Sequence, residues 1–135
     1  MRKIRETFLH FLADNLPTVP IHPVRFDPAD PSSGITQIDA ANVTFLDYTT
    51  SNGAGSTRVA LDIVFSSESA AIDAIETMQS VLSLGCYAPI LDYADTESPV
   101  QSGGNIYWDV SGIRFMRVAS DQYSHYVCIL ILRHT

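Results

Sequence analysis

The sequence predicts a single α+β domain in which a mostly antiparallel sheet of about four to five strands packs against an N-terminal helix and a central helix. Residues 57–65 alternate apolar and polar side chains with the period of two that is typical of a half-buried strand. Apolar residues then recur at helical spacing between 67 and 84. A chain of 135 residues is long enough to bury a core without disulfides or a metal, so we expect one domain over 1–135.

The first element, residues 1–16, is expected to be an amphipathic helix that Pro17 ends. The side chains that share its apolar face are Ile4, Phe8, Phe11 and Leu12. Its first turn carries Arg2, Lys3 and Arg5, whose charge is opposite to the one that the helix dipole favours there. We interpret these three bases either as a solvated helix end or as a contact with the acidic surface of a partner.

Residues 17–34 contain five of the seven prolines, which forbid a helix and disfavour a central strand. We expect an extended arm that lies along the domain and is held there by its few apolar side chains. These are Val19, Ile21, Val24 and Phe26.

The sheet and central helix should occupy residues 35–135. Residues 42–48 are the most convincing part of its first strand, with Val43 and Phe45 facing one way. The connection 49–56 is longer than a tight hairpin needs and holds no apolar side chain larger than alanine. We expect a mobile, protruding loop at 48–57 that either orders against a neighbouring subunit or is slack. Because it leads into a strand and no lysine follows, a phosphate-binding loop is not indicated.

The central helix should follow the strand 57–65 directly. Ser66 and Ser67 are natural N-cap residues, Glu68 adds negative charge to the first turn, and Gly85 offers a C-cap. The helix is therefore expected over about 67–84.

After the helix, residues 86–104 are expected to be irregular. Three carboxylates lie close together there, at Asp92, Asp95 and Glu97, but their spacing is not that of an EF-hand. We interpret them as a solvated acidic loop.

A strand is expected over 105–110, with Ile106, Trp108 and Val110 facing inward, then a kink or bulge at 111–112 and a continuing strand over 113–118. A short turn at 120–122 should lead to the last strand, 123–133.

The last strand is apolar on both faces. Val127, Ile129 and Ile131 share one face, and the opposite face carries Tyr126, Cys128, Leu130 and Leu132. This pattern is typical either of a central strand in a covered sheet or of a strand whose second face meets another subunit.

The net charge of −7 is concentrated in the middle of the chain, where residues 26–110 hold twelve acids and Arg58 as their only base. This argues against a phosphate-binding surface, which requires lysine and arginine. An acidic wall could, however, let DNA pass without sticking. No signal-peptide core and no window of roughly 20 apolar residues is present, so we expect a protein made in a cytoplasm without a membrane segment.

No catalytic, metal or cofactor site is expected. The four histidines, His10, His22, His125 and His134, are scattered over different elements. Cys128 and His134 share a strand face but lie about 20 Å apart in an extended strand, too far for one metal ion. Cys86 and Cys128 form no C-x-x-C and are expected to be reduced, structural thiols. No G-x-S-x-G occurs, and we expect a protein that is not an enzyme.

The order of elements resembles that of the tail terminator, or tail completion, proteins of long-tailed bacteriophages. The likeness covers the N-terminal helix, the proline-containing entry, the hairpin with a polar loop at 48–57, the strand and helix over 57–85, and a final hairpin with strands at 106–118 and 123–133. The chain departs from that pattern in its proline-rich arm at 17–31.

This resemblance implies a structural virion protein at the head–tail junction, assembled in the host cytoplasm. Such subunits close into a homo-oligomeric ring, expected to be a hexamer, on the tail tube protein, end its polymerisation and contact a head connector or neck protein, while DNA passes through without specific binding. The expected interface residues are the bases and the loop: Arg2, Lys3, Arg5, Tyr48, Asn52, Gly53, Arg58, Arg114, Arg117 and Arg133.

Two other interpretations remain open. The chain could be a different phage neck or head completion component, or a monomeric ligand-binding α+β domain. The second of these requires a pocket that the sequence does not indicate.

Overall fold

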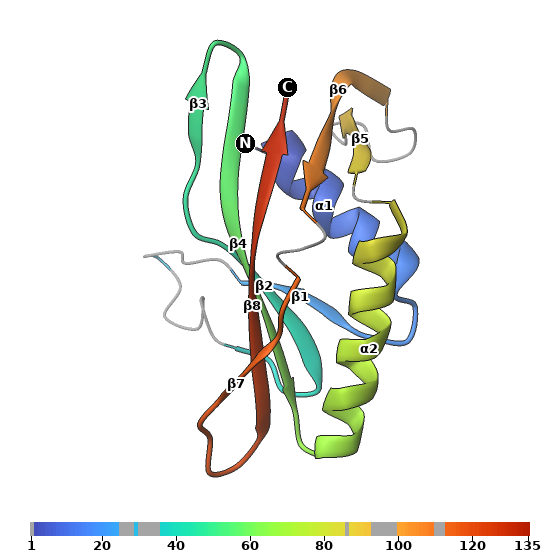
Figure 1. Ribbon diagram of the computed structural model, residues 1–135, viewed down its shortest axis with the longest axis vertical. Coiled ribbons are helices and arrows are strands. Elements are labelled where there is room, and N and C mark those ends of the chain that lie inside the picture. Colours follow the sequence, from blue (N-terminus) through green and yellow to red (C-terminus); the bar gives the residue numbers. More distant parts are fainter. Residues whose placement is uncertain (1, 25–28, 30–35, 86, 93–99, 110–112) are drawn as a thin grey trace.

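Two long antiparallel strands, β4 (Ala54–Phe65) and β8 (Ser124–His134), run through the centre of the molecule in the computed structural model (Figure 1). The structure describes residues 2–24, 29, 36–85, 87–92, 100–109 and 113–135. The remaining elements are α1 (Arg2–Asn15), β1 (Ile21–Pro23), β2 (Ala40–Phe45), β3 (Thr49–Ser51), α2 (Glu68–Gly85), β5 (Tyr87–Asp92), β6 (Val100–Trp108) and β7 (Met116–Val118).

Within the described residues the strands form one mixed sheet of eight in the order β1-β2-β4-β8-β6-β5, with β3 added beside β4 and β7 beside β8. β1 and β2 are parallel, and the other pairs are antiparallel. The predicted α+β class with two helices is confirmed, but a sheet of four to five strands was too small. The additional strands are short segments that pair at the margins of β4 and β8 or extend the sheet at its edges.

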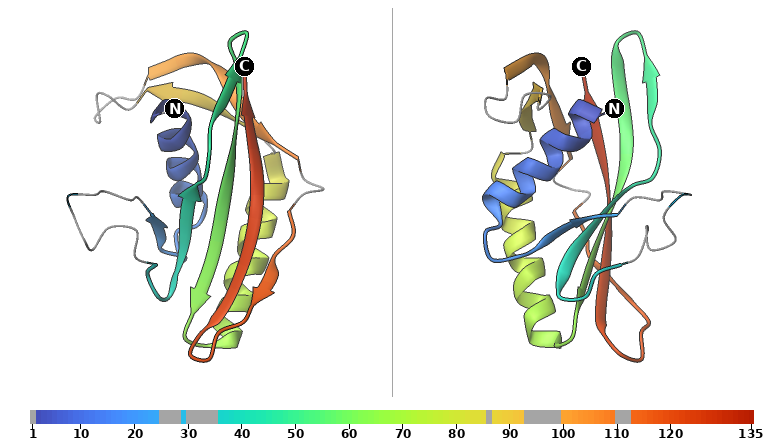
Figure 2. Two further views of the ribbon diagram at one scale, coloured as in Figure 1. Left: turned by 90° about the vertical axis from the view of Figure 1, so that its left-hand side faces the viewer. Right: turned by 180° about the vertical axis from the view of Figure 1, so that it is seen from behind.

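Both helices lie on the same face of the curled sheet, as the views in Figure 2 show. Their buried side chains meet the odd-numbered residues of β4 and the even-numbered residues of β8, so this is the core face of the sheet. The largest fully buried side chains include Phe8, Leu12, Leu61, Ile63, Met78, Leu82, Leu130 and Leu132.

Helix α1 forms where the sequence predicted it and is held by its buried face. Phe8 packs edge-on against Phe45 and Trp108, with ring centroids 6.3 and 5.9 Å apart. Thr7 attaches the helix to β5, because its Oγ1 donates to the Leu91 carbonyl at 3.3 Å and accepts from the Leu91 N–H at 3.1 Å.

The predicted central helix is also confirmed, and its N-terminus has the expected cap. Ser67 is its N-cap, since its Oγ accepts a hydrogen bond from the N–H of Ala70 at 3.1 Å. Near its C-terminus the indole N–H of Trp108 donates to the Leu82 carbonyl at 2.7 Å. That carbonyl is one of the last four of the helix, which lack helical partners.

The proline-rich arm lies along the domain where it is described. Ile21–Pro23 forms the short parallel edge strand β1, a position where proline is tolerated, and Val19 is buried. Phe26 and most of residues 25–35 fall outside the part of the chain that the structure describes.

The prediction of a mobile, protruding loop at 48–57 missed the regular strand pairing within that segment. Thr49–Ser51 forms β3, and Asn52 and Gly53 make a two-residue turn with φ of 54° and 80° into β4. Positive φ at both central residues is the signature of a type I′ hairpin, for which Asn-Gly is the preferred sequence.

The prediction that residues 86–104 are irregular was wrong for the part that the structure describes. Tyr87–Asp92 and Val100–Trp108 pair as antiparallel strands, with a register shift between Pro89 and Leu91. Asp95 and Glu97 lie outside the described residues.

The kink or bulge predicted at 111–112 lies outside the described residues, as does Val110. β6 pairs with Leu132–His134 and β7 with His125–Val127 of the same strand, β8. Residues 113–115, predicted as strand, do not join the ladder.

Candidate interaction surface

The sheet face that points away from the helices, here called the open face, carries exposed apolar side chains. Ile129 and Ile131 of β8 are 47% and 41% exposed, and Met116 of β7 is 62% exposed. Met116 pairs with Val127, which is two residues from Ile129 on the same face. Ile129, Ile131 and Met116 are called the apolar strip below.

The apolar strip lies on one side of a strand whose other side is buried. Cys128, Leu130 and Leu132 are at most 2% exposed and pack into the core. Ala60 and Arg58 of β4 pair with Ile129 and Ile131 and share the open face with them. The two-sided apolarity of β8 is therefore explained by a core on one face and an accessible apolar surface on the other.

Polar groups bound the apolar strip on both sides. Towards β2, the buried Asn42 side chain bonds the Gln37 N–H at 2.7 Å and the Gln37 carbonyl at 2.9 Å, so that residue 37 lies against β2. Near the N-terminal end of β8, one carboxylate oxygen of Asp62 lies 2.7 Å from Nε2 of His125. The accessible apolar area is thus centred on β8.

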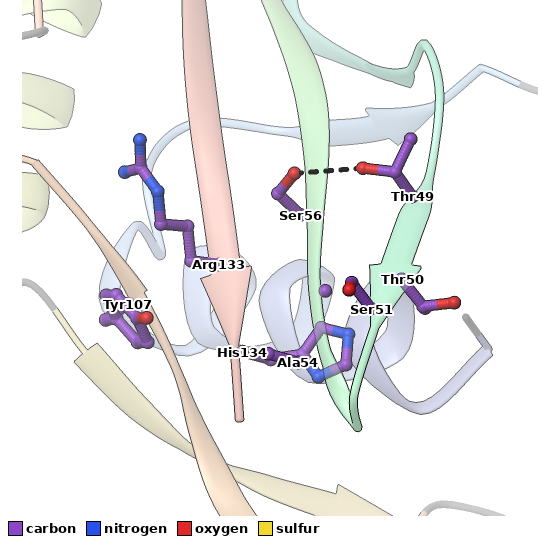
Figure 3. A pocket seen from close by; sticks show the side chains of 9 residues that line it. Thr49, Thr50, Ser51, Ala54, Ser56, Tyr107, Arg133 and His134 are labelled. Atoms are coloured by element: carbon purple, nitrogen blue, oxygen red, sulfur yellow. Dashed lines mark hydrogen bonds between the residues drawn. The ribbon is translucent and has the colours of Figure 1, made fainter.

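A shallow pocket of about 280 Å³ lies at the other end of the open face, beside the β3–β4 hairpin. Figure 3 shows Arg133 and Tyr107 on one side of it, and the Thr49 and Ser56 hydroxyls, 3.2 Å apart, on the other. Its walls are mainly hydroxyls, one guanidinium and the exposed ring of Tyr107. Such a lining offers hydrogen bonds but no enclosed apolar cavity, which small-molecule sites usually have.

The predicted N-terminal bases contact the chain itself. Arg2 and Lys3 each approach the Asp92 carboxylate at 3.6 Å, and the Arg5 guanidinium lies 5.7 Å from the centre of the Phe45 ring. These contacts hold α1 against β5 and β2. The sequence missed them because it did not predict the strand that carries Asp92.

Arg58 is paired next to a break in the sheet. Its Nε lies 2.7 Å from one Asp47 carboxylate oxygen, and its backbone N–H donates to the other at 3.0 Å. These hydrogen bonds, the backbone one first, lower the pKa of the Asp47 carboxyl. The Asp47 carboxylate thus accepts the hydrogen bond from the Arg58 N–H just beyond the end of β2, where a backbone carbonyl would be the acceptor in a continuing sheet.

Arg117 belongs to a cluster that joins β7 and β8 to the start of α2. Its guanidinium approaches Glu68 at 3.4 Å and lies over the Tyr126 ring. The hydroxyls of Ser124 and Tyr126 donate to Glu68 and lower the pKa of its carboxyl, while the same bond raises the pKa of Tyr126.

The remaining predicted interface residues are accessible. Asn52 and Gly53 form the exposed tip of the hairpin, and Tyr48 stacks on His134 near its base. Arg114 and Arg133 are exposed and form no ion pair with another described residue. Of the predicted set, Arg58 pairs with Ile131 across the β4–β8 ladder, and Arg133 shares the face of Ile131 two residues along β8.

Sequence reasoning did not include the apolar strip among the interface residues. The sequence showed that Ile129 and Ile131 lie on one face of a strand that is apolar on both faces. Alternation of side chains could not tell which of the two faces packs against the helices and which is exposed. Met116 gave no signal, because its strand was assigned without an inward and an outward face.

The parts of the chain described by the structure contain no cluster of three or more histidine, cysteine, aspartate or glutamate side chains arranged to hold a metal ion. Among the same residues, neither helix has the length and apolarity needed to span a membrane. Burial raises the pKa of the Cys128 thiol, which is therefore a poor nucleophile.

No protein-family model matches the sequence, and no curated protein matches it.

Proposed function

We propose that this protein is a structural subunit of a ring at the head-proximal end of a long phage tail, where it ends polymerisation of the tube and joins the tail to the head connector. The ring is proposed to be a hexamer that is built in the host cytoplasm and becomes part of the virion. The function is mechanical, and no bond is made or broken.

The observation that carries this proposal is the apolar strip on the open face. Ile129 and Ile131, near the middle of the β4–β8 pairing, are left 47% and 41% exposed, although Cys128, Leu130 and Leu132 on the opposite face of β8 are at most 2% exposed. Contiguous exposed apolar side chains on a soluble protein mark a surface that binds a partner. A subunit of an assembly requires such a surface, and a monomeric binding domain does not.

The arrangement of elements supports the same function. The β3–β4 hairpin extends beyond the rest of the sheet at one end of the molecule (Figure 1), as a contact to a neighbouring subunit or to the tube would require. The excess of acids in residues 26–110 suits a channel through which DNA passes without binding. The element order agrees with the resemblance to tail terminator proteins.

Native mass spectrometry of the purified chain over a range of concentrations, with negative-stain images of the same samples, tests the assembly. We expect a discrete ring, with six subunits as the dominant species. A strict monomer at every concentration would contradict the ring and favour the ligand-binding alternative.

The role in ending the tube is tested by assembling the tube protein encoded by the same genome with and without this chain. We expect tubes that carry a ring at one end and stop growing. Tubes of unchanged length without an end ring would exclude the terminator role, even if rings form alone.

A further inference from the structure

We infer that the outer face of α2 in one copy of this chain packs on the apolar strip of the next copy, in a head-to-tail interface. This inference rests on the proposed function and assigns the two surfaces that the ring would use. The occupant of the open face is thus a second copy of the chain, presented through its central helix.

The first surface is the side of α2 that faces away from the sheet. Ile72 is 38% exposed there, although its neighbours Ala71 and Ile75 are buried in the core. Asp73 and Glu76 are exposed beside it. The 18 residues of α2 contain three acids and no base. The outer surface of the helix therefore presents one exposed apolar side chain, Ile72, next to acidic residues.

The second surface is the apolar strip with the bases that border it. Ile129 and Ile131, together with Asp109 and Arg133, line a notch of about 140 Å³, which is room for one aliphatic side chain. The Arg133 guanidinium and the Arg114 guanidinium are exposed and make no ion pair within the described residues. Arg114 lies near the strip, because its backbone N–H donates a hydrogen bond to the sulfur of Cys128, the neighbour of Ile129 on β8.

The net charges of the two surfaces are opposite, because Arg133 and Arg114 outnumber Asp109 beside the strip, whereas α2 carries acids and no base. Asp73 and Glu76 on the helix would meet Arg133 and Arg114 beside the strip, while Ile72 would enter the apolar notch. Packing the strip against a second strip would instead bring the arginines of both copies together, and like charges across an interface are unfavourable. Charge therefore favours the helix of another copy as the occupant.

The positions of the two surfaces allow both to be used at once. In the left view of Figure 2 the open face of β4 and β8 is turned to the viewer and α2 lies behind it. One copy can therefore contact a neighbour on each side through two different surfaces. A repeated contact of this type closes into a ring when its rotation divides a full turn, and otherwise forms an open filament.

The test uses two full-length variants that disable one surface each. Ile131→Asp places a charge in the strip, and Ile72→Asp places one on the outer face of α2. Both side chains are partly exposed, so the folded monomer should be retained, which circular dichroism and thermal unfolding verify. Val100→Asp, at a residue that is 63% exposed on β6 and belongs to neither surface, is the matched control.

We expect wild type and the Val100→Asp variant to assemble and each of the other two variants to be a monomer. A 1:1 mixture of Ile131→Asp and Ile72→Asp should form a mixed dimer and nothing larger. The intact helix of the first variant then binds the intact strip of the second, and the disabled surfaces are left at the two ends. Native mass spectrometry distinguishes the mixed dimer once one variant carries a mass label.

Several results would overturn the inference. If strips bind strips, Ile72→Asp still assembles and the mixture yields no labelled heterodimer. If wild type forms rings and neither variant weakens them, these surfaces are wrong while the proposed function stands. A mixed dimer together with open wild-type filaments would support the interface and contradict the ring. A wild type that is monomeric throughout would contradict both.

Discussion

The imidazole of His134 occupies the space that a β-carbon at Gly55 would need. The two residues face each other across the β4–β8 ladder, and a methyl group at position 55 would overlap the His134 Nε2. That nitrogen instead pairs with the Tyr48 hydroxyl at 2.7 Å, and the two rings stack with an interplanar angle of 8°. Gly55 therefore permits a contact that ties the C-terminal end of β8 to the base of the hairpin.

Gly55→Ala should lower the stability of the protein by about 1 kcal/mol, because the imidazole must leave its site and the hydrogen bond with Tyr48 is lost. In a His134→Ala background the same substitution should cost nothing, since no ring is displaced. Urea unfolding of the wild type, both single variants and the double variant measures the coupling. Additive effects of the two substitutions would show that the residues do not interact in this way.

The hairpin that carries Gly55 is also the place where sequence reasoning failed most clearly. Length and polarity favoured a loose loop between 49 and 56, but the pair Asn52-Gly53 is a strong local signal for a two-residue turn. Asn52 and Gly53 accept positive φ more readily than other residues, so a strand can reverse there without slack. The signal was present in the sequence and was outweighed by the length of the polar segment.

Other parts of the fold could be predicted because local patterns decide them. Helix α1 ends before Pro17, and α2 begins at its Ser67 cap, so both are fixed by nearby residues. Residues 105–108 of β6 lie in the predicted strand, but β5 and the first part of β6 were not predicted, since contacts that are distant in sequence, such as those between α1 and Leu91, support them. The same limit applies to the open face, because alternation assigns side chains to two faces without saying which face the helices cover.

Leu130 and Ile131 test that assignment directly, since they are neighbours on opposite faces of β8. Leu130→Ala should cost about 2–5 kcal/mol, because it leaves a cavity in a packed core. Ile131→Ala should cost less than about 1 kcal/mol in the dilute monomer, because the side chain is 41% exposed. Urea unfolding at low protein concentration measures both, and equal costs would mean that the open face is covered within the monomer.

Glu68 should make stability depend on pH in the acid range. Its hydrogen bonds from Ser124 and Tyr126 hold the pKa of its carboxyl below its ordinary value of 4.5. The folded state then binds this proton less tightly than the unfolded state, so the stabilisation is complete above 4.5 and is lost as the pH falls through the lowered pKa.

The measurement is the urea midpoint of wild type and of Glu68→Gln as the pH falls from neutral to well below 4.5. The difference between the two proteins should shrink over that range, because glutamine does not titrate. A constant difference between wild type and Glu68→Gln would exclude this carboxylate as the source of the acid sensitivity.

Removing Asp47 should destabilise the protein more than removing its ion-pair partner Arg58. Asp47→Ala removes the acceptor of both the Arg58 backbone N–H and its guanidinium, whereas Arg58→Ala removes only an exposed side-chain partner. An exposed ion pair contributes little, so thermal unfolding should show a clearly lower melting temperature for Asp47→Ala than for Arg58→Ala. Equal losses would assign the stabilisation to the ion pair alone.

Cys128 should be protected from thiol reagents in the folded protein. Its side chain is 1% exposed and its pKa is raised by burial, so both access and the thiolate fraction are reduced. A Cys86→Ala variant leaves Cys128 as the sole cysteine, because the chain contains two. Its labelling by a thiol reagent should be slow in buffer, rise steeply across the urea transition and match a free thiol when unfolded. Rapid labelling in buffer would mean that the core around β8 opens readily, contrary to the burial of Leu130 and Leu132, which follow Cys128 on the same face of the strand.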